Sequence, residues 1–448
     1  MAVEIVKSAL IQCFNQAMDD MRFIDSKYKK PIQDNIAIIE STKPKLDKAI
    51  AAGEIQKLLI YVSLKMFTNN TRGFSKLCEY IDSYIEYEDF LFAADDNYRE
   101  HTIHSVWVMM IGFFLLDKFK FFNKCPMSDI LLRNTDDEDE FVDLIKEMEK
   151  YSAPIWLLTS LTHDLGYPIE RTKKANDLMS KMISHFGFLR QAVFDYNFTV
   201  IHQTSIENII KILSSQIVYE KDKGIYKMLN FAGRNVEWGK NFEELNHGIM
   251  SSYLLQYHLD ALLELMSYPK SDVYGLADIS EVAQSASIYR LINAISSHTS
   301  IFSYYPVVNE LPCLLMICDE LEEFSRYAKL KNEWKEVNIR TVIDCSEKFL
   351  ELKYTIDNTF GNIIIRDFFK SKVNSFNNHF EVSNEGIHKL IITCQDISKA
   401  NPIEHIYKND MENDIKVICK EGDIETRDIE FELELSGLGG CHVLKNGI

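Results

Sequence analysis

The chain has 448 residues, a formal net charge of −18, and 46% hydrophobic and 26% charged residues. These fractions are typical of soluble globular proteins, so they favour neither an intrinsically disordered chain nor a membrane-embedded one. The 67 acidic residues outnumber the 49 basic ones, which opposes attraction to a phosphate backbone and disfavours long nucleic acid as a partner.

The chain shows no sign of export or membrane insertion. Its first residues contain no basic segment followed by an apolar run, so no secretory signal is expected. The longest apolar stretch, Val106–Leu116, is shorter than the roughly 20 residues that a membrane-spanning helix needs. The cysteines stand singly with no Cys-x-x-Cys pair, as reduced thiols do. We therefore expect a cytoplasmic protein that does not enter a membrane.

Residues 1 to about 335 have apolar side chains at three- and four-residue spacing, which predicts helices. The first of them, over 2–23, 32–52, 55–67 and 73–85, would form an N-terminal helical flank at 1–98. Two polar stretches, 134–140 and 219–240, are expected to be solvated loops. The second lies between motif-bearing helices, so a lid over a functional site is the alternative for it.

After about Asn338 the chain contains β-branched and aromatic runs. Strands are expected at 363–367, 388–394, 415–419 and 429–435, in an antiparallel sheet with one or two helices near 368–380. We therefore predict a mainly α protein with a core over 99–338 and a smaller C-terminal α+β domain over 339–448. The exposed edges of such a sheet could mediate a homo-oligomer or could sense a ligand.

The strongest motif is the apolar segment 157–168, which delivers His163 and Asp164 just before Gly166 and Pro168. An imidazole and a carboxylate side by side can bind one divalent cation, or the carboxylate can bridge two. The glycine and the proline would end or bend the helix and open the site to substrate.

Further polar residues interrupt apolar helices along the chain. These residues are His101, His104, His247, His298 and Asp319. A single histidine in such a place is more often a hydrogen-bonded core residue. One shared metal centre would explain all of them, because each unpaired group would otherwise cost several kcal/mol.

The order of these groups resembles the HD superfamily of metal-dependent phosphohydrolases over about residues 99–326. The opening around His101 and His104, and the tail from Asp319 to Arg326, resemble a poorly characterised bacterial branch of it. The resemblance implies an HD-domain helical bundle. Its first metal would be bound by His104, His163, Asp164 and Asp319. Subfamilies with two further histidines bind a second metal, and His247 and His298 match the positions of those histidines.

The chain also departs from the compact family pattern: 58 residues separate His104 from His163, and 82 separate Asp164 from His247. No known substrate therefore carries over. With mixed imidazole and carboxylate ligands, the metals could be Fe, Mn, Co, Ni or Zn. The expected reaction is hydrolysis of a phosphate ester or anhydride of a nucleotide or similar small molecule, with Asp164 as the bridge and a metal-bound hydroxide as nucleophile.

Basic and aromatic side chains near the motifs are candidates for binding the phosphorylated substrate. They are Arg99, His101, Tyr167, Arg171, Lys173, Lys174, Arg290 and Arg326. The alternative for each cation is a solvated surface charge or an ion pair. His101 could instead orient a ligand, and Tyr167 could be a buried tyrosine held by its hydroxyl.

Two other functions remain open. A single-strand nuclease of the same superfamily would need a basic groove, which the acidic balance counts against. A catalytically silent HD scaffold or regulatory module would be favoured if ligands were missing, but none of the six is replaced.

Overall fold

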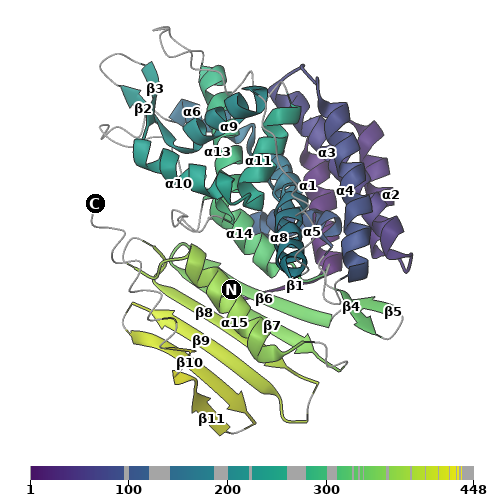
Figure 1. Ribbon diagram of the computed structural model, residues 1–448, viewed down its shortest axis with the longest axis vertical. Coiled ribbons are helices and arrows are strands. Elements are labelled where there is room, and N and C mark those ends of the chain that lie inside the picture. The colour runs from purple at the N-terminus through teal and green to yellow at the C-terminus, as the bar shows by residue number, and fades with distance from the viewer. Residues whose placement is uncertain are drawn as a thin grey trace.

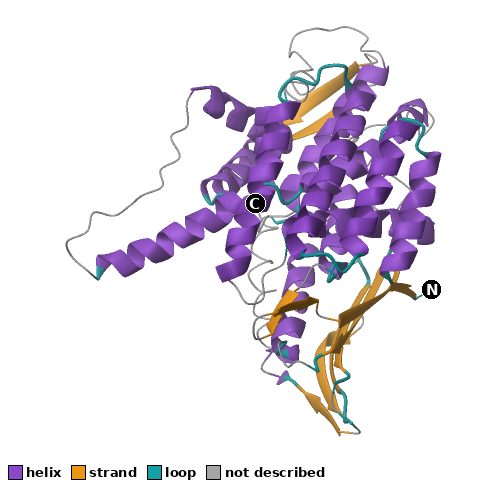
Figure 2. Cartoon of the chain, turned by 90° about the vertical axis from the view of Figure 1, so that its right-hand side faces the viewer, coloured by secondary structure: helices purple, strands orange, loops and turns teal. Residues whose placement is uncertain are grey.

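The computed structural model describes residues 2–94, 100–120, 142–185, 200–220, 225–259, 279–299 and, with gaps of one to three residues, 310–435. The chain is mainly helical, as predicted, and its C-terminal region contains a seven-stranded sheet. The helices gather at one end of the molecule and the large sheet lies at the other (Figures 1 and 2). Within the described ranges, no helix combines the length and the apolar character needed to cross a membrane. The acidic stretch 134–140 lies outside the described residues.

The helical body is built from helices that precede the large sheet. They are α1 (Lys7–Asp20), α2 (Ser26–Glu40), α3 (Lys45–Phe67), α4 (Phe74–Ala94), α5 (His101–Lys118), α6 (Val142–Glu149), α7 (Ser152–Thr162), α8 (Tyr167–Ser184), α9 (Val200–Leu213), α10 (Ala232–Glu243), α11 (His247–His258), α13 (Ile279–Ser297) and α14 (Leu311–Leu321).

Helices α5 and α7 form the centre of this body. Residues 101–115 of α5 and 154–162 of α7 are all buried, as expected for helices that are apolar on every face. The Trp156 indole donates a hydrogen bond to the Met109 carbonyl at 3.0 Å. A Cβ at Gly112 would lie 1.9 Å from the Trp156 ring, so only glycine lets the two helices approach this closely. This packing fixes α5, which carries His104, against α7, which delivers His163.

Parts of two segments expected to be helix or loop are strands instead. The helix predicted from residue 2 begins at Lys7, and β1 (Val3–Ile5) pairs antiparallel with β6 of the large sheet. The stretch 219–240 is not an extended loop: β2 (Ser215–Glu220) and β3 (Ile225–Asn230) form a hairpin, and α10 follows. Pairing of the two strands satisfies their backbone groups, which the polar composition of this stretch does not reveal.

The large sheet has the order β1-β6-β7-β8-β9-β10-β11. Its remaining strands are β6 (Asn338–Ser346), β7 (Phe349–Asp357), β8 (Lys389–Asp396), β9 (Ile403–Asp410), β10 (Asn413–Glu421) and β11 (Ile424–Arg427). A second hairpin joins β4 (Tyr327–Leu330) to β5 (Glu333–Glu336). The sheet is not wholly antiparallel, because β7 and β8 are parallel and are connected through α15 (Ile365–His379). Buried residues alternate along β6 and β7, and α15 packs against β8 and β9.

The strands expected at 388–394 and 415–419 are confirmed as parts of β8 and β10, whereas two others are wrong. The run at 363–367 leads into α15, because Phe369, Val373 and Phe376 continue with helical spacing and are buried. In the segment 429–435 the described residues are helical. A strand would place residues 429, 431 and 435 on one face, yet Phe431 and Leu435 are buried while Ile429 is 60% exposed.

Candidate metal centre

The turn between α7 and α8 holds His163 and Asp164 and is fixed by neighbouring helices. The Ser251 hydroxyl of α11 lies 2.5 Å from the His163 carbonyl oxygen and accepts a hydrogen bond from the Gly166 amide at 2.7 Å. Tyr84 of α4 donates to the Asp164 carbonyl at 3.3 Å. The backbone of this turn is therefore anchored by side chains that lie far away in the sequence.

The Asp164 carboxylate lies between two pairs of histidines. Its Oδ2 atom is 3.3 Å from His163 Nε2 and 3.6 Å from His104 Nε2. Its Oδ1 atom is 3.4 Å from His247 Nε2 and 3.6 Å from His298 Nε2. Each oxygen thus faces a different pair, which is the arrangement of a carboxylate that bridges two cations.

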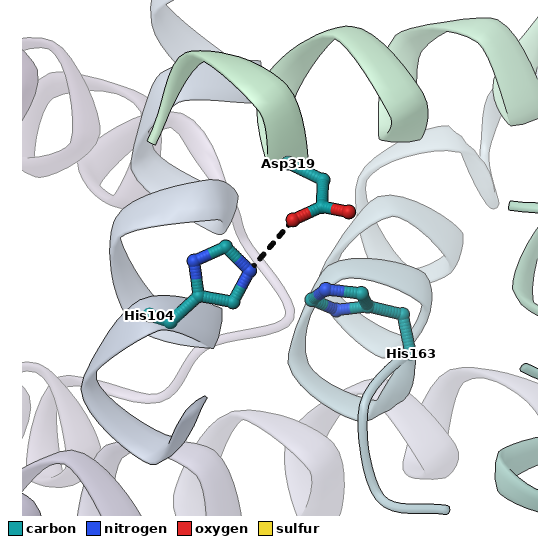
Figure 3. Close-up of side chains that lie close together, drawn as sticks. All are labelled: His104, His163 and Asp319. Atoms are coloured by element: carbon teal, nitrogen blue, oxygen red, sulfur yellow. Dashed lines mark ion pairs between the residues drawn. The ribbon is translucent and has the colours of Figure 1, made fainter. Parts of the chain in front are cut away.

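Asp319 completes one side of this cluster from α14. Its Oδ1 atom is 3.0 Å from His104 Nε2, and Figure 3 shows both side chains facing His163. Ligand atoms of His104, His163 and Asp319 lie within 4.8 Å of one another, as do those of His163, Asp164 and His298. The structure therefore brings together all six residues that the sequence predicted as metal ligands.

The Nδ1 atom of each of these four histidines lies within hydrogen-bond distance of an oxygen atom outside the cluster. The Nδ1 atom of His104 is 2.7 Å from Glu322, and that of His247 is 2.5 Å from Glu170. The Nδ1 atoms of His163 and His298 lie 2.8 and 2.5 Å from the carbonyl oxygens of residues 160 and 295. Bonds of this kind fix the ring orientation and the tautomer of metal-binding histidines.

The tautomers of His163 and His298 allow a test of whether a cation fits. A carbonyl oxygen only accepts, so each Nδ1 carries the proton, and in the neutral ring Nε2 is an acceptor. Both Nε2 atoms are buried and make no hydrogen bond within the described part of the chain, yet both face the Asp164 carboxylate. Acceptors that face one another repel unless a cation lies between them. The donor set therefore fits a divalent metal.

The electrostatics of the cluster favour a charged carboxylate and a neutral imidazole. Burial opposes ionisation of Asp164, but the neighbouring imidazoles of His163, His298 and His101 hold its pKa well below the usual range. Burial lowers the pKa of His298, against the opposing effect of Asp164. Metal binding requires these protonation states.

Three predicted substrate-binding residues form a stack beside the cluster. The His101 ring stacks on Tyr167 with centroids 3.7 Å apart, and the Arg171 guanidinium lies 4.7 Å from the Tyr167 centroid. Arg171 also donates to the Tyr167 hydroxyl. Burial raises the pKa of Tyr167 to about 12, although Arg171 opposes this shift. The Tyr167 ring in turn lies 5.7 Å from that of His247, so the stack borders the cluster.

The other predicted substrate-binding residues are not part of this stack, and some of them lie outside the described residues. Lys173 donates to the carbonyl of Glu243, at the end of α10. Arg290 is two helical turns before His298, about 12 Å along the helix axis. Lys174 lies in α8, and its side chain is outside the described part; Arg99 and Arg326 lie outside the described residues.

Three glutamates that contact the predicted ligands or the start of α5 were not predicted from the sequence. Glu322 follows Asp319 by three residues, so helical spacing from that ligand could have identified it. Glu170 lies in the first turn of α8, and only the fold brings it to His247. Glu88, which is fully buried, accepts from the backbone amides of His101 and Thr102 at 2.6 and 3.0 Å. It thereby caps α5 one turn before His104, and only the fold reveals this contact.

Comparison with known proteins finds no matching family model, no matching curated protein and no matching solved structure.

Replacing Glu322 with glutamine is expected to weaken metal binding about 10- to 100-fold, the usual effect of losing a carboxylate partner of a ligating histidine. The neutral amide no longer favours a proton on His104 Nδ1 as the carboxylate does. Metal affinity can be measured by calorimetric titration with Mn²⁺. Glu425→Gln, at an ion pair whose glutamate side chain is 56% exposed, is the control and should bind as wild type does. Wild-type affinity in Glu322→Gln would show that Glu322 does not orient His104.

Proposed function

We propose that the chain is a metal-dependent phosphohydrolase of the HD type that cleaves a phosphate ester or anhydride of a small molecule, with a nucleotide as the leading candidate. The observation that carries this proposal is the Asp164 carboxylate, each of whose oxygens faces one pair of histidine Nε2 atoms. The order of the motif residues in the sequence, which resembles the HD superfamily, supports the same function.

The residues divide into two ligand groups around Asp164. His104, His163 and Asp319 would hold one metal with Oδ2 of Asp164. His247 and His298 would hold the other with Oδ1. Two divalent metals so placed would supply Lewis acidity toward phosphoryl oxygens and would lower the pKa of a water enough to make it a nucleophile at neutral pH.

The surrounding residues favour a small anionic substrate. The side chains of His104, His163 and His298 are inaccessible, whereas those of Asp319 and His247 are 22% and 19% exposed. Substrate would therefore approach on the side of Asp319 and His247. Arg171, exposed at the end of the stack beside His247, offers a positive charge for a phosphate group. The net charge of −18 disfavours a long nucleic acid.

The test is hydrolysis of a panel of phosphate compounds by the full chain. The panel contains nucleoside mono-, di- and triphosphates, a cyclic nucleotide, a phosphodiester chromogen and single-stranded oligonucleotides. We expect turnover of at least one small compound with Mn²⁺ or Fe²⁺, and loss of that turnover after chelation. Cleavage of oligonucleotides alone would favour the nuclease. No turnover by protein with bound metal would favour the scaffold and contradict the proposal.

A further inference from the structure

The last turn of α14 and the two residues that follow it present acidic side chains in two directions. Asp319 and Glu322, three residues apart, face His104. Glu320 and Glu323, also three residues apart, face α15 of the C-terminal sheet region instead. The segment 319–323 is therefore shared between the candidate metal centre and the sheet.

Lys372 of α15 contacts both members of the second pair, Glu320 and Glu323. Its Nζ atom is 2.8 Å from carboxylate oxygens of both Glu320 and Glu323, and it donates to the Glu320 carbonyl at 2.5 Å. The Lys372 side chain is only 4% exposed and that of Glu323 only 1%. A buried ammonium with these partners loses its hydration, so its contacts with α14 must replace that hydration.

Two other side chains of the sheet region donate hydrogen bonds to Glu320. Ser375, one turn after Lys372, donates to the Glu320 carboxylate at 2.5 Å. Tyr354 of β7 donates to the Glu320 carbonyl at 3.1 Å, and its ring lies 5.2 Å from Lys372 Nζ. Three side chains from the sheet region thus converge on the residue next to Asp319.

The end of α15 carries a buried histidine, His379. His379 follows Ser375 by four residues and so continues the face of α15 that contacts α14. Burial lowers the pKa of His379, and the charges of Glu320, His298 and Asp319 act on it. This face of α15 therefore lies within the electrostatic range of the proposed ligands.

We infer that the C-terminal sheet region is part of the metal centre's support and that Lys372 is a positioning residue, which sets the orientation of Asp319 through its contacts with Glu320 and Glu323. The inference rests on the proposed function, because it takes Asp319 as a metal ligand. It assigns to the sheet region a role in metal binding rather than only in oligomerisation or ligand sensing.

The test is Co²⁺ titration of the full chain, followed by visible absorption, which reports both affinity and ligand geometry. Lys372→Met keeps the apolar stem beneath Tyr354 but removes the charge, so we expect one Co²⁺ to bind about 10- to 100-fold more weakly with altered absorption bands. Lys372→Arg should restore affinity and spectrum. Lys353→Met, at an exposed ion pair 3.9 Å long in the same sheet, is the matched control and should resemble wild type.

Loss of the lysine leaves buried carboxylates without its charge, so Lys372→Met could fold poorly. The double variant Lys372→Met/Glu323→Gln relieves that charge and should fold while still binding one Co²⁺ weakly. Wild-type affinity and spectrum in either folded variant would overturn the inference and leave the proposed function standing. Failure of the wild-type chain to bind Co²⁺ would overturn both.

Discussion

Replacing Asp164 with asparagine is expected to lower kcat/KM of the proposed hydrolase for its phosphate substrate by about 10³-fold or more, the equivalent of several kcal/mol of transition-state stabilisation. Each oxygen of this carboxylate lies within 3.6 Å of two histidine Nε2 atoms, so the substitution alters both ligand groups at once. An asparagine supplies one neutral oxygen and one amide nitrogen, and the nitrogen is not a ligand. We expect bound metal to fall in parallel with activity.

The fold should survive this substitution because asparagine has nearly the same shape as aspartate. Its hydrogen bond from Tyr84 involves the backbone carbonyl, which is unchanged. Circular dichroism and thermal unfolding of the metal-free protein provide the check. Asp117→Asn, at an exposed carboxylate of α5, is the matched control. Full activity in folded Asp164→Asn would eliminate Asp164 as the bridge.

Replacing Gly166 with alanine is expected to lower the free energy of unfolding by about 2–3 kcal/mol, the cost of inserting a methyl group where no space exists. The new Cβ would lie 2.3 Å from the His247 carbonyl oxygen and 2.6 Å from the Ser251 amide nitrogen. Both are backbone atoms of α11 and cannot rotate away. Relief requires separation of α11 from the turn that carries Asp164, so metal affinity should fall as well.

Urea denaturation of the metal-free protein measures this effect without interference from bound metal. Gly239→Ala is the matched control, because Gly239 lies within α10 and its new Cβ would meet nothing within 4 Å. Alanine there should stabilise the protein by about 0.5–1 kcal/mol, since glycine is a poor helix former. Equal stability of Gly166→Ala and wild type would refute the close packing of α11 on the turn.

The sequence predicted the helical character of the body because its apolar spacing is long and regular. The predicted boundary between helices 32–52 and 55–67 is wrong, because α2 ends at Glu40 and α3 runs without a break from Lys45 to Phe67. It failed where tertiary pairing decides the structure. Residues Val3–Ile5 are too few to show a strand pattern, and they become one only by pairing with β6, more than 330 residues away. The alternation at 429–435 fits a strand, but Ile429 is exposed while Phe431 and Leu435, four residues apart, are buried, as on one face of a helix. The parallel pairing of β7 with β8 depends on the α15 connection, which local patterns do not specify.

The candidate site was predictable to the extent that its groups interrupt apolar helices. His104, His163, Asp164 and Asp319 stand out because unpaired polar groups are costly in such surroundings. The glutamates that contact these histidines did not stand out, because glutamates are common on helices and only the fold places Glu170 against His247. The basic residues predicted to bind substrate lie in different places: Arg171 stacks beside the cluster, whereas Lys173 contacts α10. The direction in which a surface side chain points is set by packing, and spacing from a motif does not reveal it.

Asp164 is proposed to bridge two divalent metals, and the metal content of the purified chain tests this proposal most directly. Protein prepared without chelators and analysed by inductively coupled plasma mass spectrometry should contain close to two transition-metal ions per chain. About one metal per chain would contradict the bridge, and a folded chain that holds no metal, even after incubation with Mn²⁺ and Fe²⁺, would contradict the metal centre altogether.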